Sequence, residues 1–522
     1  MAVNPSMDIT ETGLLQAFAA EALLLYPYVI TAFILALAVY STREKYANLP
    51  RVNPRGPTEL TTAKQRAEFL AKGPQIISEG TKKYKDQPFM ANTELGSLLV
   101  IPPKYVAELK SNQSLLFRPV SSESVHTHLK GLEPVNPPVE INKVINTHLT
   151  KALLSLTKPM SDEATESFRD IIGDSKEWTV VDTSMVMLFV TRISSRIFMG
   201  KELCNNKGWI EASSAYVATV FHYRFVLHKW PRILRPIANM FLPGSIEIRR
   251  NLKRCQDALQ PYIDQREAHK QAALARGEKN PYNDSIEWFA QEMKNGHYDP
   301  AACQIGLALV AIHTTSDLIG QTLFDVAKNP HLIEPLRREV INVLGTYGLK
   351  KGAFPKLVLM DACFKETQRL RPIFSGVFQR KAMDEVKLSD GFVIKKGTKM
   401  MMDGPSIMLN EEIYPDPFKY DPYRFVNMRQ NPAMESRAHL VSISAEHFGF
   451  GHGTHACPGR FFAANEVKIA LAHILLKYDW KIAPGSEDLK PVSVGISQAL
   501  NPEIKFMFRR RQEELDLDSL ET

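Results

Sequence analysis

A single cysteine near the C-terminal end constrains the fold of this chain more than any other feature. Residues 447–466 read HFGFGHGTHACPGRFFAANE, in which Gly449, Gly451, Gly453 and Gly459 surround Cys457. Pro458 suits the first position of a helix, because its missing N–H would have no partner there. Apolar residues at intervals of three and four predict a buried helix over Pro458–Tyr478. Cys457 is therefore expected just before a helix N-terminus.

This position favours an anionic sulfur. Exposed N–H groups and the helix dipole stabilise a thiolate and lower a thiol pKa, and glycines let the backbone approach a flat object closely. A thiolate beside a bulky planar group indicates haem iron ligation. A nucleophilic cysteine is one alternative, although no clear His and Asn partners follow it. A glycine-rich turn with an idle cysteine is the other.

A second constraint lies near the N-terminus. Residues 22–40 read ALLLYPYVITAFILALAVY without a charge, close to the ~20 apolar residues that a membrane-spanning helix requires. Arg43, Lys45, Arg51 and Arg55 follow the segment and no Lys or Arg precedes it. The positive-inside rule then places residues 1–21 in the lumen and the body in the cytosol. Residues 41–57, with the run LPRVNPRGP, are expected to form a stiff basic hinge. A buried core helix is the alternative for the apolar segment.

Composition excludes several classes of protein. The five cysteines are scattered without a CxxC pair, which argues against a disulfide framework and against a cysteine-rich zinc site. The net charge is +7 over 522 residues, without a compact basic run, so nucleic acid is not an expected partner. With 44% hydrophobic residues the chain is able to bury a large core.

Apolar periodicity predicts a mainly α protein with a smaller β portion. Helices are expected over Thr62–Lys83, Val139–Leu156, Ala164–Gly173, Ser184–Met199, Ser245–Gly277, Pro300–Lys328, His331–Leu344, Leu357–Leu370 and Pro458–Tyr478. Strands are expected over Gly96–Pro102, Ser375–Ala382, Gly391–Met402 and Glu503–Arg510. Residues 512–522 are expected to form a polar C-terminal tail.

Four motifs in order connect these elements to a known family. Phe450, Gly453, Cys457 and Gly459 fit the pattern Phe-x-x-Gly-x-x-x-Cys-x-Gly, which resembles the haem-thiolate loop of cytochrome P450 enzymes. Upstream, ETQR supplies Glu366 and Arg369, similar to the family's Glu-x-x-Arg helix, and PYRF supplies Arg424, similar to the arginine that completes an ion-paired triad. AIHTTS at residues 311–316 resembles the oxygen-activating helix segment. A lone Glu-x-x-Arg is usually a surface helix pair, but the four motifs together imply a P450 catalytic domain over residues 58–511, preceded by one transmembrane helix.

The resemblance assigns roles to individual residues. It implies haem b as the cofactor, with Cys457 as the axial thiolate and the metal ligand, and with Phe450, Gly451 and Gly459 in the cofactor-binding loop. Thr314 is the expected oxygen-site hydroxyl that relays protons, and Thr315 is the alternative. His313 stands where the family usually has an acid. The structural alternative for Thr314 is a hydroxyl bonded to a carbonyl one turn back.

Other cofactor and substrate contacts are expected from the same resemblance. No Trp precedes Trp178, so the family's Trp-x-x-x-Arg motif is missing. His148, Lys151 and Lys143 are the substitutes expected to meet the haem propionates, and His455 and Arg380 are further candidates. The substrate pocket is expected to include Val310, Ala311, Thr314, Ile373, Phe374, Val377, Ile496 and parts of residues 115–132, for which ordinary core packing is the rival interpretation.

The resemblance implies a membrane-bound haem-thiolate monooxygenase, single-pass in the endoplasmic reticulum, that inserts one oxygen atom from O2 into a lipophilic substrate. Its electrons would come from NADPH through NADPH-cytochrome P450 reductase, with cytochrome b5 as a further partner. The sequences around Cys457 and Thr314 resemble fungal secondary-metabolism members that act on terpenoid, meroterpenoid or indole-terpenoid skeletons. Two alternatives stand beside this: a P450-like isomerase or dehydratase that needs no O2, and a non-enzymatic haem-binding or sensor protein.

Overall fold

The computed structural model describes residues 26, 28–32, 45–59, 61–293, 298–350 and 352–521. The chain divides into two units, Met1–Leu49 and Pro50–Thr522. In the first unit, Tyr26 and residues 28–32 are helical, and Tyr26, Tyr28 and Val29 are exposed. The rest of the predicted span 22–40, and the whole predicted lumenal segment 1–21, lie outside the described residues.

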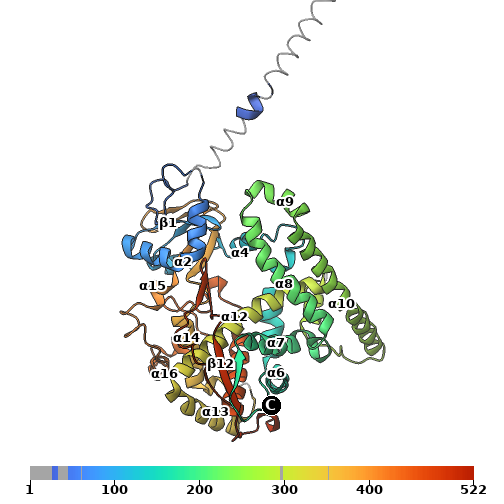
Figure 1. Cartoon of the computed structure of the whole chain (residues 1–522). Coiled ribbons are helices and arrows are strands. Elements are labelled where there is room, and N and C mark those ends of the chain that lie inside the picture. The colour runs from blue at the N-terminus through green and yellow to red at the C-terminus, as the bar shows by residue number, and fades with distance from the viewer. Residues whose placement is uncertain are drawn as a thin grey trace, which may run out of the picture. The chain divides into compact units, whose positions relative to one another are not determined.

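The second unit is mainly helical with a smaller β portion, which confirms that part of the predicted fold class (Figure 1). Its central helix is α12 (Pro300–Lys328), which has the predicted bounds. This helix packs on α7 (Ser184–Cys204), α10 (Pro243–Ala275), α14 (Val358–Leu370) and α18 (Arg460–Lys477). Within the described ranges, α12 is also the one helix long and apolar enough to cross a membrane. Here it is a core helix, because both of its ends are largely buried.

Further helices surround this core. They are α2 (Ala63–Tyr84), α3 (Val106–Leu109), α4 (Arg118–Val125), α5 (Ile141–Lys143), α6 (Thr150–Ile171), α8 (Lys207–His228), α9 (Arg235–Phe241), α11 (Ser285–Glu292), α13 (Ile333–Tyr347), α15 (Gly404–Met408), α16 (Tyr423–Gln430) and α17 (Glu435–Ala438). The helices predicted over residues 139–156 and 164–173 are not separate. A π-helical turn (Val144–Leu149) leads into α6, which continues through Pro159. Buried Leu153, Met160 and Phe168 lie on one face of α6, so its packing outweighs the proline break.

The main sheet has the strand order β1-β2-β8-β5-β3. Its strands are β1 (Phe89–Thr93), β2 (Gly96–Val100), β3 (Leu115–Leu116), β5 (Gly376–Ala382) and β8 (Lys399–Asp403), and only β2 and β8 pair in parallel among them. A second sheet joins β4 (Thr179–Asp182), β12 (Lys505–Arg510) and β9 (Tyr478–Ile482). Two small hairpins pair β6 (Val386–Lys387) with β7 (Val393–Ile394), and β10 (Val492–Val494) with β11 (Ser497–Ala499). The strand expected over residues 391–402 is therefore two strands in different sheets.

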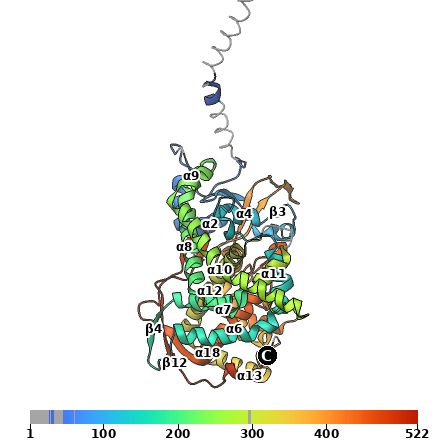
Figure 2. The same cartoon turned by 90° about the vertical axis from the view of Figure 1, so that its right-hand side faces the viewer.

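Two peripheral segments pack onto the second unit. Residues 50–52, from the predicted hinge, run beside β1, where the N–H of Met90 donates to the carbonyl of Pro50 at 2.8 Å. The last described residues, expected as a polar tail, contain buried Leu517 and the short helix Leu517–Ser519. Asp518 accepts a hydrogen bond from Thr165 of α6 at 2.7 Å. Both views place the C-terminus near α6 and α13 (Figure 2).

Candidate functional site

Cys457 lies between a 3-10 turn (Gly453–His455) and the start of α18. Its N–H donates to the carbonyl of Phe450 at 2.8 Å, which closes the loop on itself. The N–H of Thr454 donates to the carbonyl of Lys110 at 3.1 Å. Gly453 has φ of +73°, and a Cβ there would collide with the Lys110 carbonyl. A glycine is therefore required at position 453, both for its left-handed backbone and for the close approach of Lys110.

The environment of the sulfur differs from the sequence prediction in one respect. Burial raises the pKa of the Cys457 thiol, and it outweighs the N–H groups of Gly459 and Arg460 and the charge of Arg460, which act to lower that pKa. The expected lowering by the helix N-terminus is present but smaller than the cost of burying a thiolate. A bound metal ion reverses this balance, because it replaces the proton on a coordinating thiol. The donor set, a buried sulfur with two N–H groups directed at it, fits the thiolate ligand of a haem iron.

Beside the loop lies a buried cation that has no acidic partner among the described residues. Arg380 on β5 is 4% exposed, and burial lowers its pKa to about 10. Its guanidinium donates to the carbonyl of Gln379 at 2.8 Å and to that of His452 at 3.4 Å. Nδ1 of His452 is buried without a hydrogen-bond partner. His455 pairs through Nε2 with the Leu115 carbonyl at 3.0 Å. Arg380 is thus positioned to meet a carboxylate of a group bound over the loop, as a haem propionate would be.

The structure brings Glu366, Arg369 and Arg424 together. Arg369 donates to both carboxylate oxygens of Glu366 at 2.8 Å, and Arg424 donates through Nε at 3.1 Å. Glu366 and Arg369 are both fully buried. Arg369 also donates to the carbonyls of Met408 and Pro417. Each charged group of this network therefore has direct hydrogen bonds, and the two guanidinium groups share the one carboxylate of Glu366.

The middle of α12 is less covered than its ends. Thr314 is exposed and Val310 is 43% exposed, whereas Thr315 is 4% exposed. The hydroxyl of Thr314 donates to the carbonyl of Val310 at 3.1 Å, the bond expected for a helical threonine. His313 packs edge-on against Phe221 of α8, with ring centroids 5.6 Å apart, and burial lowers its pKa. Of the two threonine side chains, that of Thr314 is therefore the accessible one.

The expected pocket residues lie on two supports. Val310 and Ala311 belong to α12, whereas Ile373, Phe374 and Ile496 are joined by backbone pairing between the start of β5 and the β10–β11 hairpin. Ser375 donates its N–H to the Ile496 carbonyl at 2.8 Å. Phe374 is 41% exposed, while Val377 is buried and lies close to Gly404.

The residues expected to replace the missing tryptophan have other partners. His148 bonds through Nε2 to Glu292 of α11 at 2.8 Å and stacks on Trp288. Lys143 pairs with the same carboxylate at 2.5 Å, and Lys151 is exposed. The structure therefore groups His148 and Lys143 around Glu292 rather than with Arg380 and the cysteine loop.

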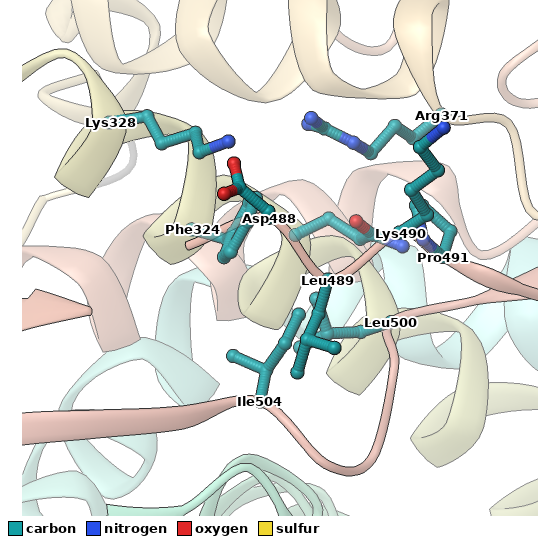
Figure 3. Close-up of a pocket in the computed structure, with 10 residues that line it drawn as sticks. Phe324, Lys328, Arg371, Asp488, Leu489, Lys490, Pro491, Leu500 and Ile504 are labelled. Atoms are coloured by element: carbon teal, nitrogen blue, oxygen red, sulfur yellow. The ribbon is translucent and has the colours of Figure 1, made fainter. Parts of the chain in front are cut away.

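A separate surface hollow of about 220 Å³ lies beside the C-terminal part of α12 (Figure 3). Lys328, Arg371, Asp488 and Lys490 surround an apolar floor that includes Leu500. Two of its three cations already have partners, since Arg371 pairs with Asp325 and Lys328 lies 5.1 Å from the centre of the Phe324 ring. Neither Cys457 nor Thr314 lines this hollow.

The sequence prediction missed α8 and with it Phe221, which contacts His313. The signal was present, because the buried residues of α8 recur at intervals of three and four: Trp209, Ala212, Tyr216, Val220, Tyr223 and Leu227. Arg460 was also missed. It donates to the Cys457 carbonyl at 2.8 Å and follows the cysteine by three residues.

Comparisons with known proteins agree with this geometry. A sequence model described as Cytochrome P450 matches residues 75–508. The chain is 43% identical to the cytochrome P450 monooxygenase eqxH of Fusarium heterosporum, over 94% of this chain and 96% of that protein. It is 34% identical to the dihydromonacolin L monooxygenase mokC of Monascus pilosus, over 92% and 93% of the two chains. The crystal structure of the haem domain of a cytochrome P450DA mutant shares the fold, with a TM-score of 0.66 at 17% identity, over 89% of this chain and 98% of that one. The chain belongs to the cytochrome P450 family.

Proposed function

We propose that the chain is a membrane-bound haem-thiolate monooxygenase that inserts one oxygen atom from O2 into a lipophilic substrate. The observation that carries the proposal is the half-buried Cys457 just before α18, with the N–H groups of Gly459 and Arg460 directed at its sulfur. Haem iron bound there would supply the activation of dioxygen. The test is incubation with NADPH, a reductase and isotopically labelled O2. Label in the product supports a monooxygenase, whereas turnover without O2 supports an isomerase or a dehydratase, and haem binding without turnover supports a sensor.

The proposal assigns the cofactor contacts as follows. Cys457 supplies the metal ligand, and Phe450, Gly451 and Gly459 shape the loop around it. Arg380 is the preferred propionate partner, because it is buried and has no bonded carboxylate among the described residues. His455 lies in the same loop, and His148 and Lys151 are weaker candidates because His148 already pairs with Glu292.

Thr314 is the proposed oxygen-site hydroxyl. Its side of α12 is open, and its bond to the Val310 carbonyl leaves the oxygen lone pairs able to accept a bond from water. Burial lowers the pKa of His313, so at neutral pH its imidazole is neutral and able to accept a proton. Thr315 is buried and is the alternative hydroxyl.

A lipophilic small molecule is the proposed substrate, specifically a terpenoid, meroterpenoid or indole-terpenoid of fungal secondary metabolism. Val310, Phe374 and Ile496 offer apolar side chains on α12 and on the segment paired with β11. The relative from Monascus pilosus is named for its action on dihydromonacolin L. A panel of terpenoids and other lipophilic compounds, titrated while the haem absorption is recorded, tests the class.

We further propose a single-pass anchor at residues 22–40 in the endoplasmic reticulum membrane, with the body in the cytosol. NADPH-cytochrome P450 reductase and cytochrome b5 would then be its electron-transfer partners. A second apolar surface supports membrane contact, because Ile233, Ile237, Met240 and Phe241 are exposed on and next to α9. Deleting residues 1–40 tests the anchor. The truncated protein should bind membranes more weakly and still bind haem, and failure to bind haem would move the boundary of the catalytic body.

A further inference from the structure

Several buried nitrogens on and around α8 have no hydrogen-bond partner in the part of the chain that the structure describes. Nε of Arg224 and both ring nitrogens of His228 are unpaired on α8, as is Nε of Arg66 on α2. The guanidinium of Arg224 lies over the rings of Phe221 and Phe225, at 5.1 and 4.6 Å from their centres. These contacts leave its N–H groups directed toward no oxygen of the described chain, so they are able to bind one from a ligand.

The surroundings of these nitrogens are positively charged. Burial, and then the charges of Arg235, Arg224, Arg66 and Lys399, lower the pKa of His228 to about 4. The ring of His126 lies 4.8 Å from that of His228, and burial lowers its pKa to about 3. Both imidazoles are therefore neutral at neutral pH. We call Arg66, Arg224, Arg235 and Lys399 the basic cluster.

Two carboxylates lie near the basic cluster, and together they offset only part of the charge of its four cations. Glu123 pairs with Lys381, with Arg232 at 3.4 Å and with Lys399 at 3.5 Å. Glu94 has one unpaired oxygen, and burial raises its pKa in spite of the charges of Arg224 and Lys399. Glu94 acts on Arg224 only through its charge, without a bond. An excess of positive charge therefore remains around Arg224.

The cluster is close to the open turn of α12. The Phe221 ring that lies under the Arg224 guanidinium also contacts the ring of His313, the residue before Thr314. One aromatic ring thus separates the guanidinium from the helix segment proposed to hold the oxygen-site hydroxyl.

We propose that the basic cluster, through Arg224, binds an anionic group of the substrate while the lipophilic part of the molecule passes Phe221 toward Thr314. The substrate is thereby a lipophilic acid, which deepens the proposed function and rests on it. A guanidinium binds a carboxylate through two parallel charge-assisted hydrogen bonds, and the apolar faces of Phe221 and Phe225 suit the adjoining hydrocarbon. An anionic lipid headgroup shares this chemistry, but the half-buried position of Arg224 between two aromatic rings favours a small molecule.

The test compares myristic acid with its methyl ester, which differ only in the charged group. Equilibrium dialysis of the labelled compounds measures binding to the full-length haem protein in uncharged detergent. We expect the wild type to bind the acid at least about tenfold more tightly than the ester, and Arg224→Gln to abolish this preference. Arg338→Gln, at an exposed side chain on α13, is the control and should retain the preference. Glu94→Gln should strengthen binding of the acid, because it removes the nearby negative charge.

Equal binding of acid and ester by the wild type would overturn the inference, as would an Arg224→Gln variant that keeps the preference. If Arg224→Gln instead weakens binding to vesicles that contain phosphatidylserine and leaves the acid unaffected, the cluster binds lipid and the inference is also wrong. The ferrous-CO spectrum of each variant separates these results from failure of the proposed function. A band near about 450 nm shows that the haem-thiolate centre is intact.

Discussion

The ion-paired network on the cysteine side of the site and the α12 side treat polar groups in opposite ways. On the cysteine side, the carboxylate of Glu366 and the guanidinium of Arg369 are fully buried and fully bonded. On the α12 side, Thr314 bonds only within its own helix, and Arg224 and His228 keep unpaired nitrogens. A buried network that is satisfied by the chain has one stable arrangement. Groups left unpaired are available to a ligand, so the difference fits the proposal that the cysteine side holds the cofactor and that the α12 side selects and processes the substrate.

The largest effect is expected at Cys457. Cys457→Ser removes the thiolate and should abolish both the ferrous-CO band near about 450 nm and product formation. Alanine at Cys204, Cys255, Cys303 or Cys363 should keep the band, because all four are buried away from the loop as small apolar residues. If the band near about 450 nm survives in Cys457→Ser, another residue is the iron ligand, and the cysteine loop is not the part that holds the cofactor.

The next effect concerns the ion-paired network. Glu366→Gln leaves Arg369 buried without a counter-charge, which should cost about 3–5 kcal/mol of stability. We expect a low haem content per protein chain and a reduced Tm. Glu334→Gln, at an exposed pair on α13, is the control and should change Tm little. A Glu366→Gln protein with normal haem content would mean that the network is not what holds the cysteine side.

A smaller effect is expected on the α12 side. Thr314→Ala deletes an exposed hydroxyl, so Tm and haem content should stay near those of the wild type. The yield of product per NADPH should fall by at least about threefold, with more peroxide released, because a proton-relay group is lost. Thr315→Ala is the matched variant. It should lower Tm through a small buried cavity and leave the yield unchanged. The reverse pattern would assign the relay to Thr315.

The smallest effect is expected in the pH dependence of Tm, through Glu466 on the cysteine side. Burial raises the pKa of Glu466 on α18 to about 8, and a bond from Ser194 only partly opposes this. The carboxyl is therefore protonated in the folded chain, and its contribution to stability is complete below its unfolded pKa of 4.5 and is lost as pH rises through about 8. Glu466→Gln should show a smaller drop in Tm between pH 5 and about 8 than the wild type. Parallel Tm profiles for the two proteins would contradict the buried, protonated state.

The motifs of the cysteine side and the bounds of α12 were predictable from sequence, whereas α8 and the basic cluster beside it were not. Cys457, Glu366, Arg369 and Arg424 are recognised by short motifs whose spacing directly reflects local geometry. Long helices such as α12 carry a clear periodicity and were predicted with the observed bounds. The predicted lowering of the Cys457 pKa by the helix N-terminus is present, but the larger effect of burial was not foreseen, because burial of the sulfur depends on segments far away in the chain.

The basic cluster shows why the rest was not predictable. Arg66, Arg224, Arg235 and Lys399 come from four separate elements, and each alone resembles an ordinary surface charge. Only the tertiary fold shows that they meet and that Arg224 lacks a bonded carboxylate. His148 gives the opposite case. Its place in the sequence suggested a cofactor contact, but Glu292, which is 144 residues away, supplies its partner.

The contact between the cysteine loop and Lys110 also bears on the order of folding. The hydroxyl of Thr454 and the carbonyl of Lys110, 344 residues apart in sequence, come within 3.4 Å. Only a glycine at position 453 leaves room for that carbonyl. During synthesis the segment with Lys110 leaves the ribosome long before the loop does. Contacts between such distant residues form late, because a long chain must first be closed. We therefore expect the loop to be completed in one of the last folding steps, so that nascent chains acquire the cofactor only after most of the body has assembled.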